Sequence, residues 1–209
     1  MLIFLAPRIV LLSVPKTGTT ALEEALAPRA EIAFRSDPSV KHLNLRQYLN
    51  RIQPLIARQG QAPFETVAVI RKPLDWLGSW YRYRSRDGLI GHANSTAHVS
   101  FEQFVTDYLR PKGRPAYARL GRQSEFLMDH DGRIAVDHIF RYEAMPLLVD
   151  FLSQRLGRPI ELQRKNVSPP GATDLEPGTR ARLRRELALD YEIWQASRHE
   201  GAATAPGAR

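Results

Sequence analysis

The chain contains no cysteine among its 209 residues. Disulfide bonds, thiolate nucleophiles and thiolate metal sites are therefore excluded, and we expect a cytoplasmic location. The sequence also lacks any apolar run of the roughly 18–20 residues that a helix needs to cross a bilayer. The apolar start at residues 1–6 is too short for a signal peptide and has no basic flank, so we expect no membrane span and no secretion signal.

Acidic residues are scarce compared with basic ones, 22 against 30, and the net charge is +8. This balance indicates an anionic partner such as nucleic acid, an acidic polysaccharide or a multiply phosphorylated nucleotide, although a merely basic surface gives the same composition. No recognised nucleic-acid-binding motif is present, so nucleic acid is not expected as a partner. The length suits one domain, which we place at residues 1–200, with a disordered tail at 201–209.

Strands and helices are expected to alternate along the first half of the chain. Residues 8–14 and 66–70 are apolar runs of strand length, and the second is apolar enough to be buried on both faces. Helices are expected at 21–26 and 74–84, the latter begun by Pro73. This order predicts an α/β fold with a parallel sheet flanked by helices. Further strands are expected at 30–34, 136–140 and 160–162, further helices at 43–56, 101–109, 146–156 and 180–198, and a loop or lid at 85–100.

A candidate phosphate loop joins the first strand to the first helix. At such a junction, backbone N–H groups and the positive end of the helix converge on an anion. Gly18 allows close approach, Lys16 adds a positive charge, and threonine hydroxyls add donors. An ordinary helix start beside an unrelated lysine is the alternative interpretation. The residues expected to bind the anion are Pro15, Lys16, Thr17, Gly18, Thr19 and Thr20.

The ATP-binding pattern Gly-x-x-x-x-Gly-Lys-Ser/Thr is absent, because Lys16 precedes Gly18 and no glycine stands five residues earlier. This spelling argues against a kinase or an ATPase. It also leaves no standard magnesium ligand, and no metal site is expected.

Arg71 follows the strand at 66–70, and Ser79 lies eight residues later. Ligands of open parallel sheets bind beyond the carboxyl ends of the strands, where Arg71 is expected. Its guanidinium would pair with a phosphate as a planar fork, and Ser79 would donate its hydroxyl. Taken singly, Arg71 would suit a surface salt bridge and Ser79 a solvated helix position.

The sequence of residues 15–20, PKTGTT, resembles the loop of the sulfotransferase superfamily that binds the 5′-phosphosulfate of 3′-phosphoadenosine 5′-phosphosulfate (PAPS). The segment RKPLDWLGS, which contains Arg71 and Ser79, resembles the motif that binds the 3′-phosphate in that family. Weaker matches at residues 123–127, 131–134, 140–143 and 166–168 resemble bacterial and Golgi-type carbohydrate sulfotransferases, so that the resemblance covers residues 8 to 195.

The resemblance implies a P-loop-NTPase-like fold and metal-free transfer of a sulfuryl group from PAPS to an acceptor hydroxyl by in-line displacement. The acceptor is expected to be a carbohydrate, and the product adenosine 3′,5′-bisphosphate. Lys16 would stabilise the charge that develops on the departing phosphate. A nucleotide- or polyanion-binding protein of the same fold without catalysis is the alternative.

The transfer needs a base that accepts the proton of the acceptor hydroxyl, a role that histidine or glutamate fills in the superfamily. His42 is the first candidate, because an unperturbed imidazole has a pKa of about 6.5. Glu31 is the second. His42 would equally suit a helix-capping or solvated position.

The basic and aromatic cluster that follows Ser79 admits two interpretations. It would bind an acidic acceptor, or it would be a packed aromatic face with solvated arginines, which we favour. Its members are Trp80, Tyr81, Arg82, Tyr83, Arg84 and Arg86.

Overall fold

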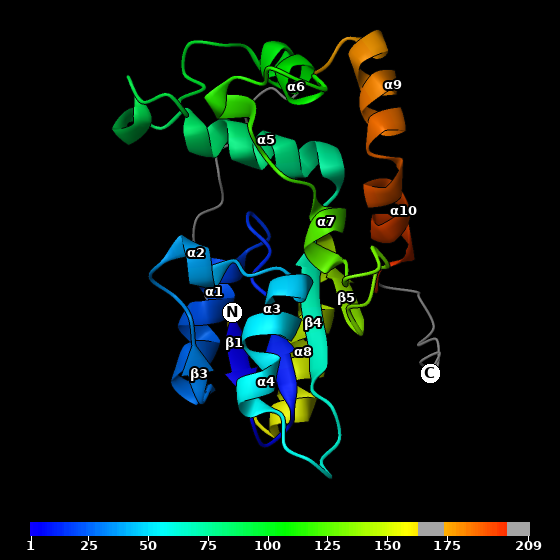
Figure 1. Ribbon diagram of the computed structural model, residues 1–209. Coiled ribbons are helices and arrows are strands. Elements are labelled where there is room, and N and C mark those ends of the chain that lie inside the picture. Colours follow the sequence, from blue (N-terminus) through cyan, green and yellow to red (C-terminus); the bar gives the residue numbers. More distant parts are fainter. Residues whose placement is uncertain (163–173, 200–209) are drawn as a thin grey trace. The chain divides into compact units, whose positions relative to one another are not determined.

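The computed structural model describes residues 1–162 and 174–199 (Figure 1). The strands are β1 (Leu2–Phe4), β2 (Ile9–Leu11), β3 (Ile32–Ala33), β4 (Glu65–Ile70) and β5 (His138–Arg141). The helices are α1 (Thr19–Leu26), α2 (Pro38–Lys41), α3 (Leu45–Arg51), α4 (Gln53–Ile56), α5 (Pro73–Arg84), α6 (Phe101–Tyr108), α7 (Gln123–Leu127), α8 (Met145–Leu156), α9 (Pro177–Glu186) and α10 (Ala188–Ala196). Short 3-10 turns lie at η1 (Ala27–Arg29), η2 (Asp87–Leu89), η3 (Ala116–Ala118) and η4 (Tyr142–Ala144).

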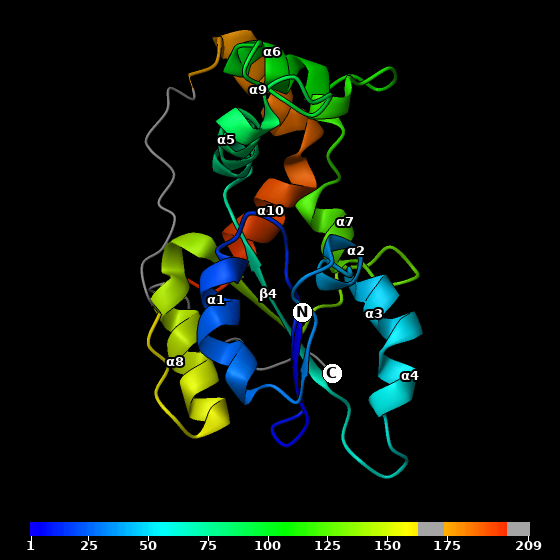
Figure 2. The same ribbon diagram turned by 90° about the vertical axis from the view of Figure 1, so that its left-hand side faces the viewer.

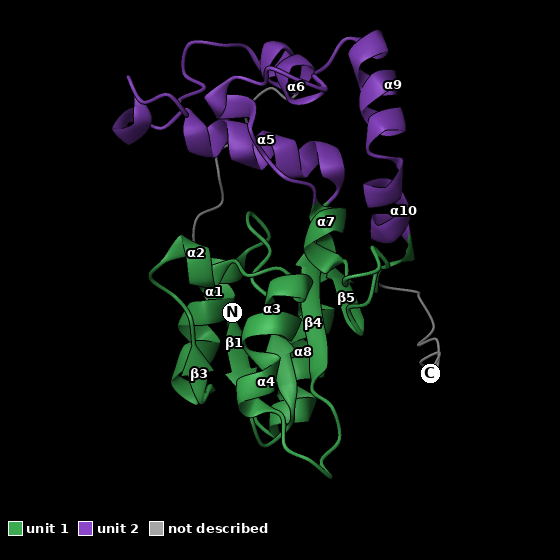
Figure 3. Ribbon diagram, in the orientation of Figure 1, with its two compact units in different colours: residues 1–71, 123–165, 196–209 green, residues 72–122, 166–195 purple. Residues whose placement is uncertain are grey.

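The chain forms two compact units, each built from separate stretches of sequence (Figure 3). The first comprises Met1–Arg71, Gln123–Lys165 and Ala196–Arg209, and it contains the sheet. The second comprises Lys72–Arg122 and Asn166–Gln195, and its described elements are helical. Of the two predicted phosphate-binding motifs, the loop and Arg71 therefore belong to the first unit, and Ser79 to the second.

The sheet has the strand order β3-β1-β2-β4-β5 and is mixed rather than all parallel, which corrects the prediction. β2, β4 and β5 run parallel, with Leu11 opposite Val67 and Ile70 opposite Arg141. β1 is antiparallel to both β2 and β3. The reason is the short link between β1 and β2: parallel neighbours need a crossover of about a dozen residues or more, whereas a turn at residues 5–8 can only reverse the chain.

Helices cover both faces of the sheet, as expected for an α/β fold (Figure 2). α1 and α8 lie on one face, and α3 and α4 on the other. The strand β4 is buried from Thr66 to Ile70, as its apolar sequence predicts. A buried apolar cluster joins α1 and α8 to the sheet: Leu2, Phe4, Ile9, Leu11, Leu22, Leu26, Val67, Val69, Phe140, Leu148, Leu152 and Ile160.

The second unit is held by an apolar core of its own. Trp76 and Leu77 of α5 pack with residues of α6 and α9, among them Phe104 and Leu183. No helix of the described residues is both long and apolar enough to cross a bilayer.

Two expected long helices are each divided into two. In 43–56, α3 ends before Ile52 and α4 begins again at Gln53, because the ring of Pro54 suits a first helical turn but not a helix interior. In 180–198, α9 ends at Glu186 and α10 begins at Ala188. The helix α8 ends as predicted at Gly157, which has a left-handed φ of 64°.

The predicted strand at 160–162 is absent. The N–H of Ile160 donates to Ser153 Oγ at 3.1 Å, so it is bound by the preceding helix rather than by a sheet neighbour. The tail at 201–209 and the motif at 166–168 lie outside the described residues.

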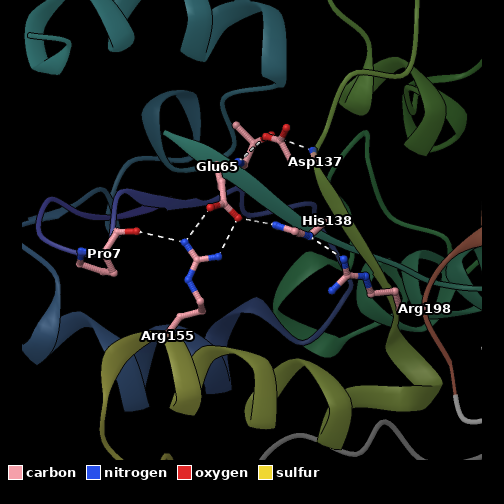
Figure 4. A network of polar contacts seen from close by, with 7 residues as sticks. Pro7, Glu65, Asp137, His138, Arg155 and Arg198 are labelled. Carbon is pink, nitrogen blue, oxygen red and sulfur yellow. Dashed lines mark hydrogen bonds and ion pairs between the residues drawn. The ribbon is translucent and has the colours of Figure 1, made fainter. Parts of the chain in front are cut away.

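A polar network closes the amino-terminal end of the parallel strands (Figure 4). Arg155 of α8 donates to both carboxylate oxygens of Glu65 at 2.7 Å. His138 Nε2 lies 2.6 Å from Glu65 Oε2, and Arg198 Nη2 lies 2.8 Å from His138 Nδ1. Because a guanidinium only donates, Nδ1 accepts and Nε2 donates to Glu65. The network thus links β4, β5, α8 and the segment after α10.

We expect Glu65→Gln to lower the free energy of unfolding at pH 7 by about 1 kcal/mol, a value kept small because the pair is partly solvated. The hydrogen bond from Arg155 lowers the pKa of Glu65 from its ordinary 4.5 to about 2. A carboxyl group whose pKa is lower in the folded than in the unfolded chain stabilises the folded state at pH values above its unfolded pKa. This stabilisation is lost as the pH falls from 4.5 towards 2. Urea unfolding at pH 7 and pH 3 should show the difference shrinking in acid. Asp150→Asn, on α8, serves as the control, and an equal loss in both variants would contradict the prediction.

Candidate active site

The predicted phosphate loop follows β2 at the carboxyl end of the parallel strands and leads directly into α1. The hydroxyl of Thr17 is buried and donates to the carbonyl oxygen of Val14 at 2.8 Å, so it closes the loop from within. Lys16 and Gly18 both have left-handed backbones, with φ of 67° and 77°. Loops with left-handed residues direct successive N–H groups into a concavity that suits an anion.

Gly18 is the residue that precedes α1, and no side chain of the described residues caps this helix start. A Cβ atom placed on Gly18 would lie 3.0 Å from Tyr142 Cε2 and 3.3 Å from Met145 Cε. Glycine is therefore favoured here for two reasons, the left-handed φ and the close approach of Tyr142. Lys16 and Thr19 are half-buried, and Thr20 is exposed.

Arg71 is held rigidly where β4 ends. Its N–H donates to Gln123 Oε1 at 2.9 Å, and its carbonyl accepts from Gln123 Nε2 at 2.8 Å. The guanidinium carbon lies 4.6 Å from the centroid of the Tyr142 ring. Its Nε is buried and has no hydrogen-bond partner among the described residues. The side chain of Gln123 thus fixes the backbone, while the guanidinium stacks on an aromatic face.

Tyr142 therefore contacts both predicted motifs of the first unit. It follows β5, Arg71 follows β4, and the loop at residues 15–18 follows β2. These strands are parallel neighbours in the order β2-β4-β5, so their carboxyl ends meet at one edge of the sheet. We refer to residues 15–18, Arg71 and Tyr142 as the carboxyl-edge site. It combines an N–H-lined loop with two cationic side chains. This combination suits a ligand that carries more than one anionic group.

His42 lies beside the strand that leads into the loop. Its Nδ1 is 2.6 Å from the carbonyl oxygen of Ser13. A carbonyl only accepts, so Nδ1 carries the hydrogen, and Nε2 is left with the lone pair. Burial lowers the pKa of His42 below its ordinary 6.5. At neutral pH the imidazole is therefore neutral, oriented by a backbone contact, and able to accept a proton at Nε2.

Glu23 is a residue of this region that the sequence interpretation missed. It lies in α1 and is only 4 % exposed. Its carboxylate accepts from Ser13 Oγ at 3.1 Å and from Lys41 Nζ at 2.7 Å. This ion pair fixes the segment that carries His42 against the start of the phosphate loop. Its position in the helix could have revealed its burial, because Glu23 lies on the same helix face as the apolar Leu26, three residues later.

Glu31 lies at the other end of the sheet. Its Oε2 accepts from the N–H of Leu5 at 2.8 Å, and the side chain is exposed. Leu5 follows β1, which is antiparallel to β2, so this contact is beside the amino end of β2 and not beside the loop. Of the two expected bases, the structure brings His42 to the segment that leads into the phosphate loop and leaves Glu31 away from it.

Ser79 lies within α5 of the second unit and is 6 % exposed. In the same helix, Arg84 donates to the carbonyls of Ala116 and Tyr117 at 3.2 and 2.5 Å, and its guanidinium carbon lies 5.1 Å from the Trp80 ring centroid. Burial lowers the pKa of Arg84. The contact with Trp80 matches the predicted packed aromatic face, but the prediction of a solvated arginine is wrong for Arg84, whose guanidinium is bound to backbone carbonyls.

Comparisons of the chain with protein-family models, with curated proteins and with solved structures found no match. Its function has therefore to be inferred from the residues and their geometry.

Proposed function

We propose that the chain is a sulfotransferase that moves a sulfuryl group from PAPS to an acceptor hydroxyl, and that its sheet is a variant of the P-loop arrangement. The observation that carries the proposal is the contact of Tyr142 with both motifs. Tyr142 Cε2 lies 3.0 Å from a Cβ placed on Gly18, and the Tyr142 ring centroid lies 4.6 Å from the Arg71 guanidinium carbon. Two motifs that are far apart in sequence are thereby neighbours at one edge of the sheet.

The two cations of the carboxyl-edge site suit a nucleotide that carries charge at both ends of its ribose. Lys16 and the loop N–H groups would hold the 5′-phosphosulfate, and Arg71 the 3′-phosphate. The buried Nε of Arg71, which has no partner among the described residues, supports this role, because buried donors are normally satisfied. Ser79 is proposed to join Arg71 on the 3′-phosphate, on the strength of their spacing in the sequence.

In the proposed reaction the acceptor oxygen attacks sulfur while the bond from sulfur to the bridging phosphate oxygen breaks. His42 Nε2 accepts the proton of the acceptor hydroxyl, and Lys16 stabilises the negative charge left on the departing phosphate. The products are the sulfate ester and adenosine 3′,5′-bisphosphate. Glu23 holds Lys41 and Ser13, and so positions both the histidine and the strand that enters the loop.

Adenosine 3′,5′-bisphosphate should stabilise the protein against heat. A ligand that binds only the native state at a hundred times its Kd adds about 2.7 kcal/mol, which raises the Tm of a chain of this size by roughly 5–10 °C. Arg71→Ala should reduce this shift, because it removes one of two phosphate contacts. Arg58→Ala, an exposed arginine of the same unit, should keep the full shift. Differential scanning calorimetry at millimolar nucleotide gives the measurement.

Transfer of labelled sulfate from PAPS to a panel of hydroxyl acceptors tests the catalytic half. The absence of both nucleotide stabilisation and sulfate transfer would overturn the proposal. Stabilisation without transfer to any acceptor would instead favour a nucleotide-binding protein of this fold without catalysis.

A further inference from the structure

A second cationic site lies within the second unit. A pocket of about 230 Å³ is lined by Tyr108, Leu109, Pro111, Arg114, Arg122, Arg182 and Glu186, which we call the arginine pocket. Its lining comes from the end of α6, the loop that follows it, residue 122 and the helix α9. Sites for drug-sized ligands measure about 300–1,000 Å³, so the arginine pocket suits a single small group or one sugar ring.

Two of the three arginines of the pocket are held by backbone carbonyls. Arg182 Nη2 donates to Leu109 O at 2.8 Å, and Arg114 Nε donates to Arg110 O at 2.8 Å. The Arg114 guanidinium carbon also lies 5.1 Å from the Tyr108 ring centroid. Among the described residues, neither Arg114 nor Arg182 forms an ion pair with a carboxylate. Each guanidinium has five N–H donors, so these contacts orient the groups and leave both charge and donors for a ligand.

Arg110, which does not line the pocket, forms an ion pair with the buried Asp107 at 2.7 Å, unlike Arg114 and Arg182. Arg84 also donates to backbone carbonyls, and it is half-buried outside the pocket. Glu186 is the one acidic residue of the lining, against three arginines. It is exposed, and its ion pair with Arg185 is long at 3.9 Å. Glu186 therefore offers a carboxylate at the pocket that can accept a hydrogen bond from a hydroxyl.

We infer that the arginine pocket binds the carboxylate or sulfate group of an acidic sugar. Arginine forks match such oxyanions in geometry and stay charged at every physiological pH. Because their positions are set before the ligand arrives, little ordering remains to oppose binding. Arg114 and Arg182 select an oxyanion, and Glu186 selects a hydroxyl beside it. The inference rests on the proposed function in one respect, the expectation that the substrate is a carbohydrate.

Isothermal titration of the full chain without nucleotide tests the pocket. The probe is a disaccharide that carries one glucuronate, and its matched control is the same disaccharide with the carboxylate reduced to an alcohol. We expect the acidic disaccharide to bind at least ten times more tightly than the reduced one. This comparison needs no variant, so it stands even if a substitution prevents folding. Equal affinities would overturn the inference.

Two matched substitutions locate the binding. Arg182→Gln should weaken binding of the acidic disaccharide at least tenfold, whereas Arg180→Gln should change it less than twofold. Arg180 is an exposed arginine of the same helix that does not line the pocket, so both variants lose one charge from α9. Equal weakening in both would mean that general surface charge binds the disaccharide, and would overturn the inference.

The affinity of inorganic sulfate, compared with that of the disaccharide, distinguishes a site for an acidic sugar from a site for free anions. We expect sulfate to compete with the disaccharide but to bind at least ten times more weakly, because it offers Glu186 no hydroxyl. Sulfate binding as tightly as the disaccharide would contradict an acidic-sugar site. Lys16→Gln should bind the disaccharide like the wild type. Wild-type protein that binds the acidic disaccharide selectively but neither binds nucleotide nor transfers sulfate would contradict the proposed function alone. Nucleotide binding and sulfate transfer with equal affinities for the two disaccharides would contradict only the pocket.

Discussion

Replacement of Lys16 by glutamine should lower kcat for sulfuryl transfer about a thousandfold while the protein stays folded. Lys16 is half-buried, and it precedes Gly18 in a loop that ends at the start of α1. A fixed positive group at the atom where charge develops is typically worth 10²–10³ in rate, because it acts in a site shielded from water. Glutamine keeps the length of the side chain and removes the charge. Steady-state kinetics with labelled PAPS gives kcat and KM separately.

Two other variants make this result specific. Lys112→Gln removes an exposed lysine of the second unit and should leave kcat within twofold of the wild type. Arg71→Ala should weaken binding of adenosine 3′,5′-bisphosphate at least tenfold, yet lower kcat far less than Lys16→Gln does. If Lys16→Gln keeps full turnover, or if the two variants show the same split between kcat and KM, the roles assigned to the two cations are wrong.

The parts of the fold that local sequence determines were predicted well. β4 is apolar and buried from Val67 to Ile70, and such a run suits a strand covered on both faces. The start of α5 depends on the fixed φ of Pro73, and the end of α8 on the freedom of Gly157 to adopt a positive φ. The direction of β1 was missed because residues 1–6 carry no signal of their own. The short turn to β2 determines that direction, and it can be recognised only once both strands are known.

The missed features of the site depend on contacts between distant residues. Tyr142 lies in a segment that carried only a weak resemblance, and nothing in its neighbours predicts that its ring would meet both Gly18 and Arg71. Glu23 looked like one of two ordinary helix glutamates. A buried carboxylate is costly unless it is paired, and its partner Lys41 comes from a different helix. Sequence reasoning could name the candidate anion-binding groups, but not the side chains that hold them in place.

The choice of base between His42 and Glu31 shows what the structure adds. On sequence alone each was a titratable residue soon after the phosphate loop. The pairing of β3 with β1 places Glu31 beside Leu5, at the end of the sheet away from the loop. The end of α2 places His42 on the carbonyl of Ser13. The difference follows from strand direction, which no local pattern reports.

His42→Gln should therefore lower kcat by 10²–10⁴, the usual contribution of a general base. Because burial lowers the pKa of His42 below 6.5, the neutral ring predominates at pH 7. The rate of the wild type should be full at neutral pH and fall as the pH drops through the lowered pKa, since protonation removes the lone pair of Nε2. The variant should lose this acid limb as well as its rate. Profiles of kcat against pH between 5 and 8 give both readouts.

Glu31→Gln and His130→Gln are the controls for this prediction. Glu31 is the other expected base, and His130 is an exposed histidine of the same unit. Both variants should keep kcat within twofold of the wild type and keep the fall in rate at acidic pH. Among the contacts of the described residues, none joins Glu31 or His130 to the segment that leads into the phosphate loop. A large loss in Glu31→Gln with normal turnover in His42→Gln would reverse the assignment. Loss of rate in His42→Gln with an unchanged acid limb would make His42 a positioning residue, held on Ser13 for the sake of the loop rather than for proton transfer.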